Sequence, residues 1–207
     1  MHARTTTVHA DTQRIDEGIR YVRDEVMPMV QGMPGCMGLS MLCDRDSGRC
    51  IVTTSWDSEE TMSASREAVR AMREQATDVM GGQFEVQEWE IAVVHRAHAM
   101  GDGACARVTY PRLRDMGQAD RFIDGWKSNI LPRLEGFDGF ASASLMVHRS
   151  TGRAVGTACF DSREALEQTR ETATRMREEF SSRMDVEITD VLEMEVAIHH
   201  LRVPERV

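Results

Sequence analysis

The sequence GCMGLSMLCDRDSGRCIVTTSWDSEE occupies residues 35–60, and GFASASLMVHRSTGRAVGTACFDSRE occupies residues 139–164. The two stretches align without a gap at an offset of 104 residues, and nine of their 26 positions are identical. Identity at a fixed internal offset indicates that one structural unit was duplicated in tandem. The identical pairs are Gly35/Gly139, Ser40/Ser144, Arg45/Arg149, Gly48/Gly152, Arg49/Arg153, Thr53/Thr157, Asp57/Asp161, Ser58/Ser162 and Glu60/Glu164.

Each stretch has the pattern of a β-hairpin. In the first copy, extended runs near residues 37–44 and 49–56 flank a turn that contains Gly48. The second copy repeats the pattern around Gly152. Short runs rich in apolar and β-branched residues, separated by a turn with glycine, predict two paired antiparallel strands in each copy.

Helices are predicted on both sides of each hairpin. Apolar residues recur at helical spacing before it, from Ile15 to Met29 and from Ala119 to Leu134. Pro28 and Pro132 are expected to kink or end this helix. After the hairpin, Asp57-x-x-Glu60 and Asp161-x-x-Glu164 resemble capping boxes. The inner face of the following helix is expected to carry Met62, Val69 and Met72 in the first copy and Leu166, Ala173 and Met176 in the second.

A strand is predicted at both ends of each copy, so the element order is βαββαβ twice. This order is typical of ferredoxin-like α+β units, in which both helices cover one face of a four-stranded sheet. The other face needs a cover, and the sister sheet of the same chain supplies it. We therefore predict two ferredoxin-like βαββαβ repeats, residues 1–96 and 104–203, which form a pseudo-twofold α+β barrel within one chain.

Composition excludes several classes of partner. The formal charge is −9 and the isoelectric point about 5.3, without a basic patch, which argues against a nucleic acid or an anionic membrane as partner. No run of 18 apolar residues and no apolar leader occur, so a cytoplasmic protein is expected. Five cysteines in no ligand spacing predict free thiols and no metal, although a bridge between Cys43 and Cys50 is conceivable across the hairpin.

The segments Met33–Gly38 and Ser55–Glu60 resemble the antibiotic biosynthesis monooxygenase (ABM) family of dimeric α+β barrels. The resemblance extends more weakly to Asp138–Phe140 and Phe160–Glu164 in the second copy. It implies a cofactor-independent monooxygenase, or a related enzyme, that acts on a small apolar or aromatic molecule. The alternative is a non-catalytic small-molecule-binding or scaffold protein of the same fold, and further homodimerisation is compatible with either.

Haem-degrading members of this family use an Asn on the first strand and a Trp and a His on the second helix. The corresponding places hold Thr7 and Pro111, Ser65 and Thr169, and Glu74 and Glu178. None of the three residue types is kept in either copy. We therefore expect no haem and no other bound cofactor.

Five residues are candidates for lining a ligand pocket, and no catalytic residue can be assigned. Trp126 is either a stacking platform or a core residue, and His9 is either a proton acceptor or a solvated side chain. Thr7, Ser65 and Thr169 occupy the haem-family positions. Because the first copy is rich in methionine, which adapts to irregular space, we expect at most one good pocket per chain, in that half.

Two glutamates recur near the end of each copy. Glu88 and Glu90 match Glu193 and Glu195. They could gather as a metal or acid cluster, but ion pairing with the abundant arginines is favoured. All the basic residues except Lys127 are arginines, and this bias predicts no binding function.

Overall fold

The computed structural model describes all 207 residues and divides into two units. The first comprises Met1–Trp89 and Val196–Val203, and the second comprises Glu90–Glu195 and Pro204–Val207. Hydrogen bonding orders the eight strands as a closed barrel, β1-β3-β2-β8-β5-β7-β6-β4. The predicted α+β barrel within one chain is thus confirmed.

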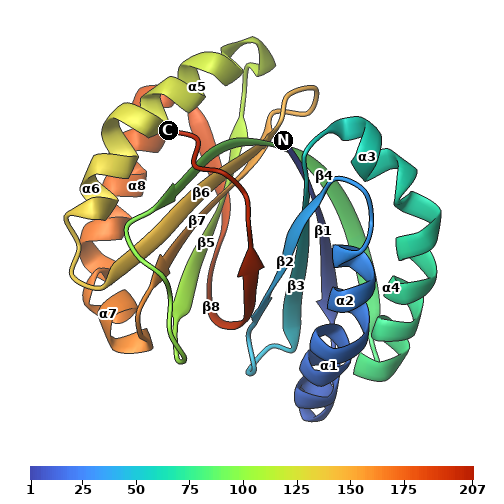
Figure 1. Cartoon of the computed structure of the whole chain (residues 1–207). Coiled ribbons are helices and arrows are strands. Elements are labelled where there is room, and N and C mark those ends of the chain that lie inside the picture. The colour runs from blue at the N-terminus through green and yellow to red at the C-terminus, as the bar shows by residue number, and fades with distance from the viewer. The chain divides into compact units, whose positions relative to one another are not determined.

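The first copy contains four strands and four α-helices (Figure 1). A π-helical turn, η2, joins α1 to α2, and a short 3-10 turn, η1, precedes α1. The elements are β1 (His2–His9), η1 (Thr12–Arg14), α1 (Ile15–Tyr21), η2 (Val22–Val26), α2 (Met27–Gln31), β2 (Cys36–Cys43), β3 (Arg49–Trp56), α3 (Glu59–Ala64), α4 (Arg66–Met80) and β4 (Gln83–Arg96).

The second copy repeats this order element by element. Its elements are β5 (Cys105–Leu113), η3 (Met116–Gln118), α5 (Ala119–Gly125), the π-helical turn η4 (Trp126–Ile130), α6 (Leu131–Glu135), β6 (Phe140–His148), β7 (Arg153–Phe160), α7 (Arg163–Gln168), α8 (Arg170–Met184) and β8 (Val186–Leu201). Two strands pass from one unit into the other: β4 does so after Trp89, and β8 does so after Glu195.

The two predicted hairpins form, with β2 paired antiparallel to β3 and β6 paired antiparallel to β7. In β2 and β3, Cys43 lies opposite Cys50, and the turn between them places Gly48 at φ 76°. A Cβ at Gly48 would also overlap the carbonyl oxygen of Ala10, so this turn requires glycine on both counts. Gly152 has φ 67° in the equivalent turn between β6 and β7.

The helix after each hairpin differs in two details from the prediction. Its N-cap is Ser58, whose hydroxyl accepts from the backbone N–H of Thr61, so the cap is one residue later than the predicted Asp57. In the second copy Ser162 is the cap. The helix is also interrupted at Ser65 and at Thr169, which separate α3 from α4 and α7 from α8.

The first helix of each copy continues past its proline. Pro28 lies in the first turn of α2, and Pro132 lies in the first turn of α6, each directly after a π-helical turn. A proline at this position removes an N–H that the change of helix type already leaves without a regular partner. The prolines therefore do not end the predicted helices.

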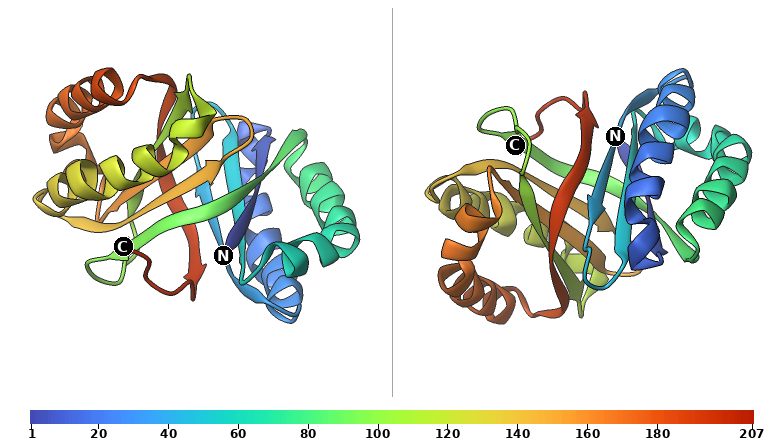
Figure 2. Two further views of the ribbon diagram at one scale, coloured as in Figure 1. Left: turned by 90° about the horizontal axis from the view of Figure 1, so that it is seen from above. Right: turned by 90° about the horizontal axis from the view of Figure 1, so that it is seen from below.

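Each unit has its own hydrophobic core between helices and strands. In both views of Figure 2, the helices of a unit lie on one side of that unit's strands. Trp56 at the end of β3 and Phe160 at the end of β7 are fully buried and occupy equivalent places in the two copies. The aromatic position that ends each predicted hairpin is thus a core anchor.

Candidate functional site

A cavity lies between the helices and the strands of each unit. The first has a volume of about 50 Å³ and is bounded by β1, β3, η2, α2 and α4. The second has a volume of about 60 Å³ and is bounded by β5, β7, β8, η4, α6 and α8. The expectation of a single good pocket in the first half is therefore wrong, because both copies retain one.

The two cavities are equivalent, but their walls differ in side-chain size. At four helix positions a larger residue replaces a smaller one, and at two strand positions a smaller residue replaces a larger one. The helix pairs are Val22/Trp126, Val26/Ile130, Val30/Leu134 and Ala76/Phe180, and the strand pairs are Val52/Gly156 and Thr54/Ala158. The helix pair Val69/Ala173 changes in the opposite direction.

Trp126 gives the second cavity its aromatic wall. The residue is 6% exposed, and a Cβ built on Gly156 would lie 3.5 Å from its Nε1. Glycine at this strand position therefore leaves room for the indole. The prediction left Trp126 open between a stacking platform and a core residue. The side chain belongs to the hydrophobic core and lines the cavity, and a role as a stacking platform stays a prediction.

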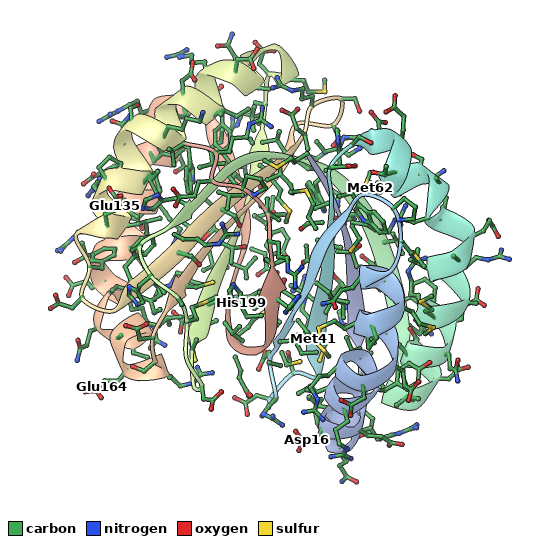
Figure 3. The ribbon with its side chains drawn as sticks, viewed as in Figure 1. Asp16, Met41, Met62, Glu135, Glu164 and His199 are labelled. Atoms are coloured by element: carbon green, nitrogen blue, oxygen red, sulfur yellow. The ribbon has the colours of Figure 1, made fainter.

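A buried arginine from β1 lines the first cavity. The Arg4 side chain is 2% exposed, and its Nε and Nη2 donate to Glu88 Oε1 at 3.0 and 2.8 Å. Nη1 donates to Ser65 Oγ at 2.9 Å, and Nη2 donates to the carbonyl oxygen of Met62 at 2.7 Å. Met62, on α3, is labelled in Figure 3. The break between α3 and α4 thus supplies acceptors that hold the guanidinium in place.

The second copy repeats this network. Arg107 on β5 donates through Nε and Nη2 to Glu193 Oε1 at 3.1 and 2.8 Å. Its Nη1 donates to Thr169 Oγ1 at 2.7 Å, and its Nη2 donates to the carbonyl oxygen of Leu166 at 3.0 Å. A buried cation needs such acceptors, so Arg107 and Arg4 are both fixed parts of the cavity wall.

Glu88 and Glu193 are held as carboxylates. Burial alone would raise the pKa of Glu88, but the hydrogen bonds and charges of Arg4 and Arg66 lower that pKa overall. The pKa of Glu193 is lowered in the same way by Arg170 and Arg107, against the effect of burial. The favoured prediction of ion pairing is confirmed for these two residues. As ionised, paired groups they are poor proton donors.

A second arginine lines each cavity without a carboxylate partner within ion-pair distance. Arg73 on α4 donates from Nε to Thr6 Oγ1 at 3.2 Å, and its guanidinium lies 5.5 Å from the centre of the Phe84 ring. Arg177 on α8 donates from Nη2 to Thr174 Oγ1 at 2.8 Å. Burial lowers the pKa of both guanidinium groups, and the nearby charge of Arg4 or Arg107 lowers it further.

One of the five candidate pocket residues lines a cavity, and two others hydrogen-bond to an arginine that does. Trp126 lines the second cavity. Ser65 accepts a hydrogen bond from Arg4 of the first cavity, and Thr169 accepts one from Arg107 of the second cavity. Thr7 and His9 line neither cavity. On β1 the cavity residues are Arg4, Thr6 and Val8, so Thr7 projects from the opposite face, and His9 is exposed at the strand end.

The four arginines that line the cavities were not among the predicted pocket residues. On the first strands the copies correspond at an offset of 103, which pairs Arg4 with Arg107 and Thr6 with Thr109. The shared Arg-x-Thr pattern is the signal that could have revealed this register. With an offset of 104, Thr7 is paired with Pro111, although the structural partner of Pro111 is Val8.

The described residues include no group of three or more His, Cys, Asp or Glu that could hold a metal ion. Glu90 is instead paired with Arg149, at 2.6 Å. None of the five cysteines is joined in a disulfide. No helix has the length and apolar character needed to span a membrane.

Two proteins of Mycobacterium tuberculosis strain H37Rv are similar to this chain over its whole length. The uncharacterized protein Rv2557 is 47% identical over 207 residues, which cover the whole chain and 92% of the relative. The uncharacterized protein Rv2558 is 44% identical over 208 residues, which cover the whole chain and 88% of the relative. No protein-family model matches the chain.

Solved structures of similar fold include enzymes and proteins related to enzymes. An anthrone oxidase-like protein has a TM-score of 0.66 at 17% identity, with 96% of this chain and 92% of that one covered. The heme-degrading enzyme LmHde of Listeria monocytogenes has a TM-score of 0.55 at 12% identity, with 94% and 99% covered.

A third structure of similar fold is described as related to the ABM proteins. It is an uncharacterized ferredoxin fold protein of Listeria monocytogenes 4b F2365 that is related to antibiotic biosynthesis monooxygenases. Its TM-score is 0.51 at 12% identity, with 94% of this chain and 95% of that one covered. At such identities these likenesses show the fold alone. The chain shares its fold with a protein related to the ABM family, and it belongs to the family of the M. tuberculosis proteins Rv2557 and Rv2558.

Proposed function

We propose that the protein binds a small apolar molecule in the cavity of each unit. The observation that carries this proposal is that the cavity is kept in both copies although most of its wall residues differ. A core under selection for stability alone tends to fill such space, because empty volume costs stabilising contacts. Here a tryptophan on η4 is matched by a glycine on β7, and the space persists.

The walls suit an adaptable apolar ligand. Six valines line the first cavity, and methionine side chains at positions 72, 80 and 176 contribute to the two walls. A volume of about 50 Å³ admits few ligand atoms, but unbranched thioethers can move aside at low cost. A ligand the size of a substituted benzene would therefore widen the cavity by moving Met72 and Met80.

Oxygenation without a cofactor is the second candidate function. Solved relatives in fold include an anthrone oxidase-like protein, and two guanidinium groups line each cavity. Such groups would stabilise the anion of a phenol-like substrate, which can then pass an electron to dioxygen. The cavities have no His, Asp or Glu in their linings to accept the substrate proton, so binding is the better supported function.

Methionine-methyl NMR tests the binding proposal in the intact protein. The chain would be labelled with ¹³C at the methionine methyl groups and titrated with toluene as a neutral apolar probe. We expect saturable shifts of Met72 and Met176, while the exposed Met29 and Met116 stay unchanged. Shifts confined to Met29 and Met116, or none at all, would refute binding in the cavities.

Dioxygen consumption distinguishes the second candidate. Anthrone would be added to the aerated protein, and the rate compared with that of the Arg107→Met variant. An oxygenase predicts protein-dependent oxygen uptake that falls in the variant. A binding protein predicts uptake no faster than that in buffer.

A further inference from the structure

We propose that each cavity selects an apolar molecule that bears one carboxylate, bound by Arg73 in the first unit and by Arg177 in the second. This inference rests on the proposed binding function and names the chemical class of its ligand. Both residues line their cavity from the middle of the long helix, α4 or α8.

The two arginines in each cavity differ in how fully the protein uses them. Arg4 makes four hydrogen bonds, two of them to Glu88. Arg73 makes one, from Nε to Thr6, which leaves both of its Nη groups available. A guanidinium presents five N–H donors in a planar fork that matches a carboxylate. Arg73 is therefore the group with unused donors.

The charges around the first cavity do not balance. Arg4, Arg66 and Arg73 bring three positive charges. Glu88, the carboxylate paired with Arg4 and Arg66, and the exposed Glu74 beside Arg73 bring two negative charges. Arg66 is exposed and screened by solvent, but Arg73 is half-buried against apolar side chains. One ligand carboxylate at Arg73 would compensate its charge where water does so poorly.

A purely structural role explains Arg73 better than it explains Arg177. Arg73 lies over the ring of Phe84, and this cation–π contact holds it at the strand. Arg177 makes no equivalent cation–π contact, and the β8 residue that lines its cavity is Ile188. The arginine is nevertheless kept at the same cavity position. What the two residues share is the cavity, together with the buried arginine beside them.

A carboxylate fits these groups better than a phosphate. A phosphate ester brings up to two negative charges and three acceptor oxygens, which need several donors around them. Each cavity offers one guanidinium with unused donors, and its remaining wall is mostly apolar. A single bidentate pair satisfies one carboxylate and leaves the apolar part of the ligand to the valine or aromatic wall.

The test compares ligands that differ only in charge. Benzoate and benzamide have nearly the same shape, and hexanoate and hexanamide extend the comparison to a flexible chain. Dissociation constants would be measured from the methyl shifts of Met72 and Met176, which report on the two cavities separately. We expect each carboxylate to bind about tenfold or more tightly than its amide, as charge-assisted hydrogen bonds imply.

Matched variants locate the effect. Arg73→Met should weaken benzoate about tenfold at the Met72 signal, leave benzamide unchanged there, and leave the Met176 signal unaffected. Arg70→Met removes the same charge one turn away on the exposed side of α4 and serves as control. Arg177→Met and the exposed Arg175→Met form the equivalent pair on α8. Thermal unfolding would confirm that each variant is folded.

The outcomes separate this inference from the proposed function. Equal affinities for benzoate and benzamide, or equal losses in Arg73→Met and Arg70→Met, would overturn the carboxylate inference and leave apolar binding intact. If neither ligand shifts Met72 or Met176, both the inference and the proposed function fail. Tighter binding of inorganic phosphate than of benzoate, lost in Arg73→Met, would overturn the assignment of the ligand class.

Discussion

Trp126 lies against Gly156, with the indole Nε1 3.5 Å from the place a Cβ on that glycine would take. In the first copy the same two positions hold Val22 and Val52. In the second copy a large residue on the helix packs against a glycine on the strand, and in the first copy a valine packs at each of the two positions. Side-chain sizes at equivalent positions therefore differ in a compensating way between the two copies, and both cavities stay open.

This relationship predicts strong coupling between the two positions. Trp126→Val should lower the free energy of unfolding by about 3–4 kcal/mol, because it empties a buried aromatic site. Gly156→Val should cost about 1–3 kcal/mol, because its methyl groups would crowd the indole. The double variant restores the pairing of the first copy, so we expect a loss at least about 1 kcal/mol smaller than the sum of the two. Urea unfolding measures all three, and strict additivity would contradict the account.

Arg4 should be important for stability as well as for the cavity. Replacing it by Met removes the main partner of Glu88 and leaves the acceptors on Ser65 and Met62 unused. We expect Arg4→Met to lower the free energy of unfolding by about 2–4 kcal/mol. The control Arg66→Met removes an exposed partner of the same carboxylate and should cost less than about 1 kcal/mol. If the two variants lost similar amounts of unfolding free energy, the buried hydrogen bonds of Arg4 would not be the source of the stabilisation.

Acid should destabilise the protein through Glu88 and Glu193. Their pKa values are lowered in the folded state, so they stabilise the fold above their unfolded pKa of about 4.3. This contribution is lost as the pH falls through the folded values, where both states become protonated. The free energy of unfolding should thus decrease below about pH 4. Glu88→Gln and Glu193→Gln should each flatten the decrease, whereas the exposed Glu67→Gln should leave it unchanged.

Haem should not bind stoichiometrically, although a heme-degrading enzyme shares the fold. Neither cavity is lined by a histidine, the usual axial ligand of haem iron, and each presents arginines instead. Hemin titration should give no saturating Soret shift at one or two equivalents. Reductant and oxygen should cause no protein-dependent loss of the band. A saturating shift that a His9→Ala or His95→Ala variant abolishes would contradict this expectation.

Local patterns made the fold predictable. Helical and strand periodicities, the turn at Gly48 and the repeat itself reflect short-range physics, which the amino-acid order encodes directly. The helix caps and the prolines were less predictable. The choice of Ser58 over Asp57 as the N-cap, and the π-helical turn before Pro28, both depend on where the neighbouring element starts. The closed strand order follows from the need to cover each sheet.

The cavities were harder to predict for a different reason. A shift of one residue along a strand exchanges its two faces. The resemblance to the haem-degrading proteins selected Thr7, whereas Thr6 and Val8 line the cavity. The arginines could not be singled out by residue type, since nearly all basic residues of the chain are arginines. What distinguishes Arg4 and Arg73 is burial beside a cavity, which depends on contacts far apart in the sequence.

Anomalous diffraction from crystals that contain 4-bromobenzoate tests the central claim most directly, because the bromine marks the ligand and its position needs no assumption about the site. The account predicts two bromine peaks per chain, one beside Val22 and Val52 and one beside Trp126 and Gly156. The carboxylates should lie within hydrogen-bond distance of Arg73 and Arg177. Bromine peaks confined to the protein surface, or two empty cavities at saturating ligand, would contradict it.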